Sequence, residues 1–330
     1  MSLSRRQMLR GVAAFGGMAL GGPAAGAAAP RLATPAPRRI AVLDWAMAET
    51  AVALGLPPVA MVEPARYRDR AQDPDLPGDV IDLGLMTQPD LERLLLLHPD
   101  LIVTGHGQAE TIGPALARIA PVWEGSIYTG DGAPLDAACR VTRDLGERLG
   151  QAEAAEAAIA RALARIDAAA ARIGEGVRRL PVAVFIFQDP RHGWIADRNG
   201  FIAAVMDRMG LTPAWTGPGS FWGYTAIGID RLAALPDCRL IYADLPVTET
   251  GGWTPDASTI WQALPPVAAG HAQRIGPFWY FGALPTMARF ADQLADALTG
   301  AGKAGDGEDA GEGEDSGKGE DACEGEREAG

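Results

Sequence analysis

The chain has 330 residues, of which 48% are hydrophobic and 22% are charged, and its formal net charge is −13. This balance is typical of a soluble globular protein, and the length allows two domains of ordinary size. The acidic body carries no basic stripe, which argues against a nucleic-acid partner because phosphate binding requires clustered cations.

The first residues have the pattern of an export signal. The basic segment "SRRQMLRG" is followed by an Ala/Gly-rich stretch, and "AGA" at residues 25–27 offers a small-residue cleavage site. The pair Arg5 and Arg6 resembles that of a twin-arginine signal, although a chance pair in an arginine-rich chain is the alternative. We predict a twin-arginine signal peptide over residues 1–27 and a periplasmic location.

The other end of the chain has a different composition. Residues 300–330 are rich in Gly, Glu and Asp and hold eleven acidic residues against three basic ones. Such a segment cannot bury enough apolar surface to fold. We predict a disordered acidic tail there.

The sequence offers no metal site of the protein's own. The cysteines show no C-x-x-C spacing, and the histidines are widely scattered. These residues are Cys139, Cys238 and Cys323, and His98, His106, His192 and His271. We expect no resident metal and no cofactor.

The segment between signal and tail consists of two α/β blocks. Residues 38–148 alternate short apolar strands, such as "RIAVLD", with helical patterns, which favours a mainly parallel sheet covered by helices. Residues 179–299 repeat this order and close with the helix "LPTMARFADQLADAL". We predict an N-terminal and a C-terminal lobe with these bounds.

A long helix is expected between the blocks. Residues 149–178 contain "QAEAAEAAIARALARIDAAAARI", which lacks Gly and Pro and repeats apolar residues at helical spacing. At the helical rise per residue this segment makes a stiff connection of about 30 Å. The predicted fold class is α/β, with two lobes joined by one long α-helix; a helix packed on one lobe alone is the alternative.

Catalytic signatures are missing from the sequence. It contains no Walker loop, no G-x-S-x-G elbow and no H-E-x-x-H motif. The segment "GHGQAE" follows a predicted strand but lacks the third glycine of a dinucleotide fingerprint. We predict a binding protein rather than an enzyme, although active sites also form from residues distant in sequence.

Aromatic residues gather at the ends of predicted elements. "GSFWGYTAIGIDRLAA" (residues 219–234) is interpreted as a loop that opens a helix and whose three rings hold a flat or apolar ligand. Trp45 and "PFWYFGA" (residues 277–283) follow predicted strands, at the edge where ligands of two-lobed α/β proteins bind. Core packing is the alternative for each ring, and it is the interpretation preferred for Trp123, Trp194, Trp215, Trp253 and Trp261.

These segments carry a resemblance to a known family. "FWGYTAIGIDRLAA" and the later "IWQALPPVAAGHAQRIGPFWYFGALPTMARF" resemble the ferric-hydroxamate-type periplasmic binding proteins that feed siderophore ABC importers. "RRIAVLDWAMAETAVALGLPPVAMVE", "LPGDVIDLGLMTQPDLERL", "ALARIAPV" and "DPRH" support the likeness, which runs from Arg38 to Ala297. The family's fold, two α/β lobes bridged by a long helix, agrees with the order of elements above.

The resemblance also implies which residues bind the ligand. Rings are expected to contact the organic shell of the chelate, because the chelator supplies the oxygen ligands of ferric iron. The rings that match the family's positions are Trp222 and Trp279, followed by Trp45, Tyr224, Tyr280 and Phe281.

Some positions depart from the family's pattern. Met86 stands where hydroxamate binders place an arginine whose donors contact hydroxamate oxygens. Near the family's tyrosine this sequence has His106 or Gln108. Arg70 stands where an aromatic residue is common, so it is a candidate to supply the missing cation, with a solvated loop arginine as the alternative. The siderophore is therefore left open.

The resemblance also implies partners for this protein. In the wider superfamily one exposed acid on each lobe docks onto arginines of the membrane permease, and Glu92 and Asp230 match those positions. Both begin predicted helices, where the helix dipole favours acids in any case. The family implies a monomer that works with an inner-membrane ABC permease and, indirectly, with an outer-membrane receptor system.

The sequence thus predicts a periplasmic protein that captures a ferric siderophore, of hydroxamate type, between two lobes and delivers it to a permease. Within the class of binding proteins the alternative is a cobalamin or haem carrier, in which His106 would be the axial ligand to test. From a different class the alternative is a periplasmic enzyme exported by the twin-arginine route.

Overall fold

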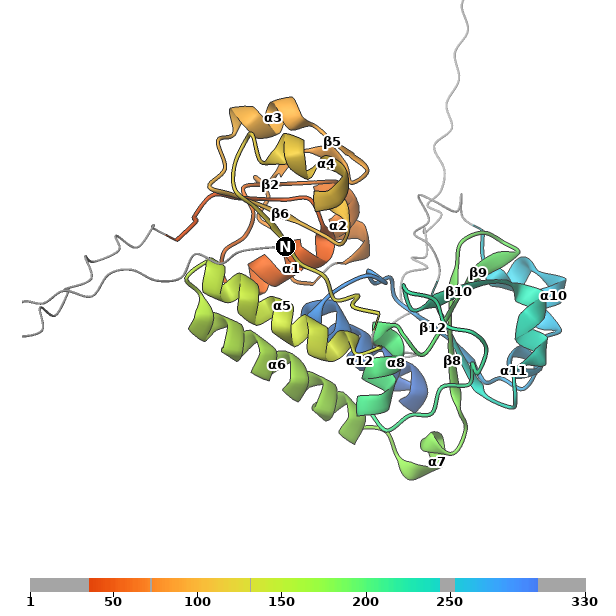
Figure 1. The fold of residues 1–330 in the computed structure, drawn as a ribbon. Coiled ribbons are helices and arrows are strands. Elements are labelled where there is room, and N and C mark those ends of the chain that lie inside the picture. Colours follow the sequence, from red (N-terminus) through yellow and green to blue (C-terminus); the bar gives the residue numbers. More distant parts are fainter. Residues whose placement is uncertain (1–35, 72, 131, 244–252, 302–330) are drawn as a thin grey trace, which may run out of the picture. The chain divides into compact units, whose positions relative to one another are not determined.

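The computed structural model describes residues 36–71, 73–130, 132–243 and 253–301, which belong to one compact unit (Figure 1). The predicted signal peptide and nearly all of the predicted acidic tail lie outside the described residues. Within the described residues, no helix is both long enough and apolar enough to cross a membrane.

A five-stranded parallel sheet forms the first half of the fold. Its order is β3-β2-β1-β6-β7, with all neighbours parallel. The strands are β1 (Ile40–Val42), β2 (Ala60–Met61), β3 (Ile81–Asp82), β6 (Leu101–Thr104) and β7 (Val122–Glu124). Their connections contain α1 (Trp45–Ala53), α2 (Pro64–Arg70), α3 (Leu91–Leu96) and α4 (Gln108–Leu116), besides the short pair β4 (Gly84–Leu85) and β5 (Gln88–Pro89). The central strands are fully buried, as an apolar run predicts for a parallel strand covered on both faces.

A second five-stranded sheet, of order β10-β9-β8-β11-β12, forms the other half. Here β8, β11 and β12 are parallel, whereas β9 and β10 run antiparallel to their neighbours. The strands are β8 (Val182–Phe187), β9 (His192–Ala196), β10 (Tyr224–Gly228), β11 (Arg239–Ala243) and β12 (Ala272–Ile275). The helices of this half include α7 (Glu175–Arg178), α8 (Phe201–Arg208), η2 (Pro255–Ala257), α10 (Thr259–Gln262) and α11 (Pro265–Ala268). Two α/β lobes are therefore present, as predicted; the exact domain bounds stay predictions.

The prediction of a helix directly after the aromatic loop is wrong. Tyr224 begins strand β10, and the helical segment that follows is a short 3₁₀ helix, η1 (Ile229–Ala234). The reason is a partner strand that the sequence did not reveal: β10 pairs antiparallel with β9, from Tyr224 opposite Ala196 to Gly228 opposite His192. Alternate side chains of both strands therefore share one face of the sheet.

The long helix α6 (Ala152–Ala171) contacts α1 in the first half and α8 in the second, and it packs beside α5 (Pro134–Arg148) and α12 (Leu284–Thr299). The alternative of a helix packed on one lobe alone is thus wrong. Its buried face is a stripe of small residues with two larger ones, which lets neighbouring helices approach closely. That face comprises Ala155, Ala158, Ile159, Ala162, Ile166 and Ala169.

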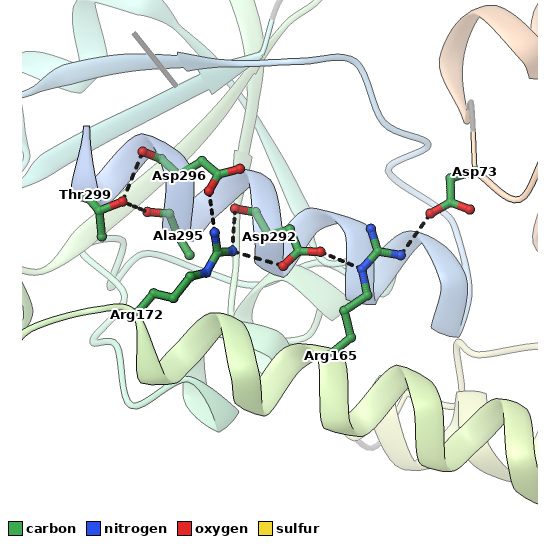
Figure 2. A network of polar contacts seen from close by, with 7 residues as sticks. All are labelled: Asp73, Arg165, Arg172, Asp292, Ala295, Asp296 and Thr299. Carbon is green, nitrogen blue, oxygen red and sulfur yellow. Dashed lines mark hydrogen bonds and ion pairs between the residues drawn. The ribbon is translucent and has the colours of Figure 1, made fainter. Parts of the chain in front are cut away.

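Ion pairs fix α6 against α12 along their exposed edge (Figure 2). Arg172 pairs with Asp292 at 2.9 Å and with Asp296 at 2.5 Å. Arg165 pairs with Asp292 at 2.5 Å and with Asp73, in the loop after α2, at 2.9 Å. All five side chains are partly exposed, so each pair is worth only about 0–1 kcal/mol, and the network sets the register of the two helices more than it stabilises the fold.

A buried carboxylate joins α12 to the first half of the chain. The N-cap residue of α12 is Ala283, which has no side-chain oxygen to offer. Glu49, fully buried on α1, supplies the missing acceptor: its carboxylate accepts hydrogen bonds from the backbone N–H of Ala283 and from the hydroxyl of Thr286, the latter at 2.6 Å. Unpaired N–H groups at a helix start need such an acceptor. One side chain therefore ties the two halves together.

Burial raises the pKa of Glu49 from 4.5 to about 8, against the lowering effect of its hydrogen bonds. The folded protein thus binds this proton more tightly than the unfolded chain. The group's contribution to stability is full below the unfolded pKa and is lost as the pH rises through the folded pKa.

We expect Glu49→Gln to flatten the pH dependence of stability, because glutamine removes the titration and keeps one of the two acceptor oxygens, available to the N–H of Ala283. Urea unfolding at about pH 5 and about pH 8 measures the difference, which should amount to a few kcal/mol in the wild type and shrink in the variant. Glu156→Gln, an exposed acid on α6, is the matched control and should keep the wild-type slope. An unchanged slope in Glu49→Gln would contradict this assignment.

Candidate functional site

A cavity of about 800 Å³ is lined by residues from both halves of the fold. Its floor on the first half lies where β1, β6 and β7 end, which is the edge at which parallel sheets bind ligands. The volume is within the range of about 300–1,000 Å³ typical of small-molecule sites. The cavity is therefore the candidate binding site.

Three chain segments of the first half line the cavity. Asp44 and Met47 follow β1, the segment from Gly105 to Gln108 follows β6, and Ser126 to Tyr128 follow β7. Met86, from the turn between β4 and β5, completes this wall. This wall is mostly neutral, because Asp44 is its only carboxylate among the described residues.

Aromatic rings dominate the wall of the second half. Trp194 on β9 and Tyr224 on β10 lie on the same face of the sheet, with ring centroids 5.9 Å apart. Trp222 comes from the loop before β10, and Trp279 and Phe281 from the segment between β12 and α12. Phe281 lies within 6 Å of each of the other four rings, centroid to centroid. The wall is thus one continuous aromatic cluster.

The segment 277–283 is held from behind by Tyr280. Its ring points away from the cavity, where its hydroxyl accepts a hydrogen bond from Arg70 Nη1 at 2.8 Å. Its backbone carbonyl accepts from the hydroxyl of Tyr224 at 2.5 Å and, weakly, from that of Tyr128 at 3.5 Å. Residues on either side of Tyr280 therefore present their rings to the cavity from a fixed backbone.

Rings from both halves meet at the lip of the cavity. His106 lies 5.0 Å from Phe221 and 5.5 Å from Trp222, and Tyr128 lies 5.2 Å from Trp222, between ring centroids. Phe221 and Trp222 are 41% and 44% exposed, which is high for such large apolar side chains. Of the two, Trp222 lines the cavity, so its ring can contact a ligand while part of it stays open to solvent.

The loop that carries these two rings is fixed by a glycine and by a buried acid. Gly223 has φ +78° and packs so closely on Gly200 that a Cβ would lie 2.0 Å from its Cα. The buried Asp197 carboxylate accepts from the backbone N–H of Ser220 at 2.8 Å and from the hydroxyl of Thr225 at 3.3 Å. The loop is therefore held in place by contacts within the protein.

The structure brings seven of the ten predicted ligand-binding residues to the cavity wall: Met86, His106, Gln108, Trp222, Tyr224, Trp279 and Phe281. The other three, Trp45, Arg70 and Tyr280, are buried behind it. The Trp45 ring packs 4.5 Å from that of Trp279, and its indole N–H donates to the Val62 carbonyl at 3.0 Å.

Gln108 is already engaged by the backbone. Its Oε1 accepts from the N–H of Gly105 at 2.8 Å, and its Nε2 donates to the carbonyl of Leu43 at 3.0 Å. It therefore shapes the cavity floor more than it offers donors to a ligand.

Sequence reasoning missed the other wall residues, among them Asp44, Met47, Tyr128 and Trp194. Trp194, for which core packing is the preferred interpretation from sequence, lines the cavity. The signal that could have found it is its position in a short alternating strand. Asp44 directly follows a strand and caps α1, accepting from Met47 N–H at 3.0 Å, so its place at the strand end could also be inferred from the sequence.

Burial changes the pKa values of three side chains in the wall. Burial raises the pKa of Asp44 from 3.8 to about 6, which leaves the group mainly ionised at neutral pH. Burial also raises the pKa values of Tyr128 and Tyr224 well above 10, so both hydroxyls stay protonated. Among the described residues that line the cavity there is no lysine or arginine.

The described residues hold no cluster of metal-ligating side chains. In the described residues no group of three or more His, Cys, Asp or Glu side chains is close enough to hold an ion.

The two predicted docking acids are exposed. Glu92 lies in the first turn of α3, next to the exposed Leu95 and Leu96, and Asp230 lies in the first turn of η1. Neither belongs to the cavity wall.

Comparison with known proteins identifies the family. The family model for periplasmic binding proteins matches residues 40–264. The chain belongs to the periplasmic binding protein family. This periplasmic binding protein is 34% identical over 267 residues, 80% of its length and 88% of the relative's, to the iron(3+)-hydroxamate-binding protein FhuD of Escherichia coli K12. It is 39% identical to the achromobactin-binding periplasmic protein of Dickeya dadantii over 124 residues, 36% of this chain and 38% of that one.

Solved structures show the same fold. The siderophore-binding protein FhuD from Vibrio cholerae, bound to Fe³⁺–Desferal, superposes with a TM-score of 0.74 at 25% identity, covering 79% of this chain and 98% of that one. The triscatecholate siderophore-binding protein FeuA of Bacillus subtilis gives a TM-score of 0.62 at 16% identity, covering 80% and 93%. At that identity the second likeness shows the fold alone.

Proposed function

We propose that this periplasmic binding protein captures a ferric siderophore of hydroxamate type in its aromatic cavity and delivers it to an inner-membrane ABC permease. The observation that carries the proposal is the cavity itself: it is large, walled by rings, and lined by no lysine or arginine among the described residues. The relative from Escherichia coli, which matches over most of both chains, supports the same ligand class.

The chemistry of the ligand suits this wall. Ferric iron is a hard cation that takes oxygen ligands, and hydroxamate groups supply them with a single negative charge each, so a full set neutralises the iron. A neutral complex with an organic shell needs contact with apolar rings more than it needs cations. Trp222, Trp279 and Phe281 offer such contact, and Tyr224 stands beside them.

Met86 stands on the cavity wall where the family places an arginine. Arg70 does not replace that arginine, because it is buried and donates to Tyr280 behind the wall. This protein is therefore proposed to hold its chelate mainly by ring contact and shape, with Trp45, Arg70 and Tyr280 supporting the wall.

Tryptophan fluorescence tests the function. We expect saturable quenching of the mature protein by a ferric hydroxamate, because coloured chelates close to Trp222 and Trp279 accept their excitation. Trp222→Ala should weaken the affinity roughly tenfold or more, the loss of a large buried ring contact, whereas Trp215→Ala, outside the cavity, should leave it unchanged. Saturable quenching by cobalamin or haem alone would contradict the siderophore and favour the other carriers.

Docking on the permease is proposed to use Glu92 and Asp230, one acid from each half of the chain. Their exposure leaves both carboxylates available to arginines of a partner. The exposed Leu95 and Leu96 beside Glu92 add apolar area to the same surface.

The double variant Glu92→Lys with Asp230→Lys should abolish uptake of the ferric chelate by cells while leaving its affinity for the purified protein unchanged. Glu153→Lys is the matched control, because it reverses an exposed acid at the same position of helix α6. Loss of uptake in the control as well would point to helix-dipole effects on stability instead of docking, and full uptake in the double variant would refute docking.

Export of the protein is proposed to depend on a twin-arginine signal within residues 1–27, supported by Arg5 and Arg6. The protein is proposed to act as a monomer that receives its chelate after an outer-membrane receptor system has imported it. Replacing both arginines by lysine in a reporter fusion tests the signal: export that persists would contradict it.

A further inference from the structure

The cavity wall contains one carboxylate that the proposed function does not explain. Asp44 follows β1 at the floor of the cavity, and its neighbours along the wall, such as Met47, Met86 and Gly105, are neutral. An acid is a poor choice for a wall that only packs against an apolar shell, since covering it removes an ionised group from water at a cost that its hydrogen bond to the start of α1 offsets only in part.

The position of this carboxylate is fixed. Its Oδ1 accepts from the backbone N–H of Met47 at 3.0 Å, as an N-cap does. Its Oδ2 lies against Gly105, where a Cβ would be 2.5 Å from that oxygen. The carboxylate therefore occupies space that is free only because residue 105 is a glycine, and any larger side chain there would clash with it.

The N-terminus of α1, which Asp44 caps, offsets part of its charge, and the neighbouring charged side chains add little to that. Glu49, the next acid along α1, lies behind the wall and is mainly protonated at neutral pH because burial raises its pKa to about 8. No arginine or lysine is among the described wall residues. His106 stands at the lip, among the rings of Phe221 and Trp222. Asp44 is thus the one carboxylate on the described part of the wall, and no lysine or arginine of that wall faces it.

We propose that Asp44 selects the charge of the bound chelate: the cavity takes a ferric chelate that is neutral or carries a protonated amine, and it rejects one with a negative charge. This inference rests on the proposed function and narrows its substrate class. It excludes ferric catecholates, because catechol groups carry two negative charges each and leave the complex anionic. It favours hydroxamate chelators that end in a free amine, whose ammonium group donates to a carboxylate.

One family of chelates isolates the effect of charge. Desferrioxamine B ends in an amine, its N-acetyl derivative is neutral there, and its N-succinyl derivative ends in a carboxylate, while the hydroxamate groups around iron are the same. We expect affinities for the ferric complexes to fall in that order, by about tenfold per step, the size of one hydrogen bond to a charged group.

The variant Asp44→Asn keeps the cap of α1, because asparagine accepts the same hydrogen bond, and it removes the charge. It should bind the three complexes within about threefold of one another, so that the order of the wild type disappears. Asp90→Asn is the matched control: Asp90 caps α3 in the same way, accepting from Arg93 N–H at 2.9 Å, but lies outside the cavity. It should keep the wild-type order.

Each outcome decides the proposal. Equal affinities of the wild type for the three complexes, or an order that persists in Asp44→Asn, would overturn selection by charge and leave the siderophore function standing. An equal loss for all three complexes in Asp44→Asn would assign the residue to structure alone and would also overturn it. If none of the three complexes binds to the wild type, the hydroxamate function itself fails.

Discussion

The structure depends on how the backbone between β12 and α12 is held. This segment, residues 277–283, belongs to the second half of the chain, yet its supports come from both halves. Glu49 caps the helix that it leads into, Arg70 binds the hydroxyl of Tyr280, and the Tyr224 hydroxyl binds the carbonyl of the same residue. The segment that presents rings to the cavity is thus also a segment that joins the two halves. A change in the contacts between the halves would therefore alter the positions of these rings.

In this arrangement the chelator and the protein contribute different parts of the binding. Iron chemistry is left to the chelator, whose oxygens satisfy the metal, and the protein contributes a preformed wall of rings with one carboxylate at its floor. Hydrogen bonds within the protein hold parts of this wall in place: Gln108 binds backbone atoms, and Asp197 holds the loop of Trp222. Preorganisation of this kind keeps the entropic cost of binding low.

Much of the fold could be predicted from the sequence, because buried parallel strands are continuous apolar runs and α6 has an uninterrupted helical pattern. The strand β10 could not be predicted, because its stability comes from pairing with β9, and local propensity does not encode that contact. Most rings of the aromatic wall were predicted from their place near the ends of predicted elements and from the resemblance to the binding-protein family. The buried position of Arg70 was not predicted, because no sequence pattern distinguishes a solvated arginine from one buried against Tyr280. Trp194 was missed because its strand was not predicted.

The most direct test of the proposed function is a crystal structure of the mature protein with a ferric hydroxamate, in which the anomalous signal locates the iron. We expect iron inside the cavity, with the organic shell in contact with Trp222 and Trp279 and with every ligand of the iron supplied by the chelator. Iron coordinated by a protein side chain such as His106, or located outside the cavity, would contradict the proposal.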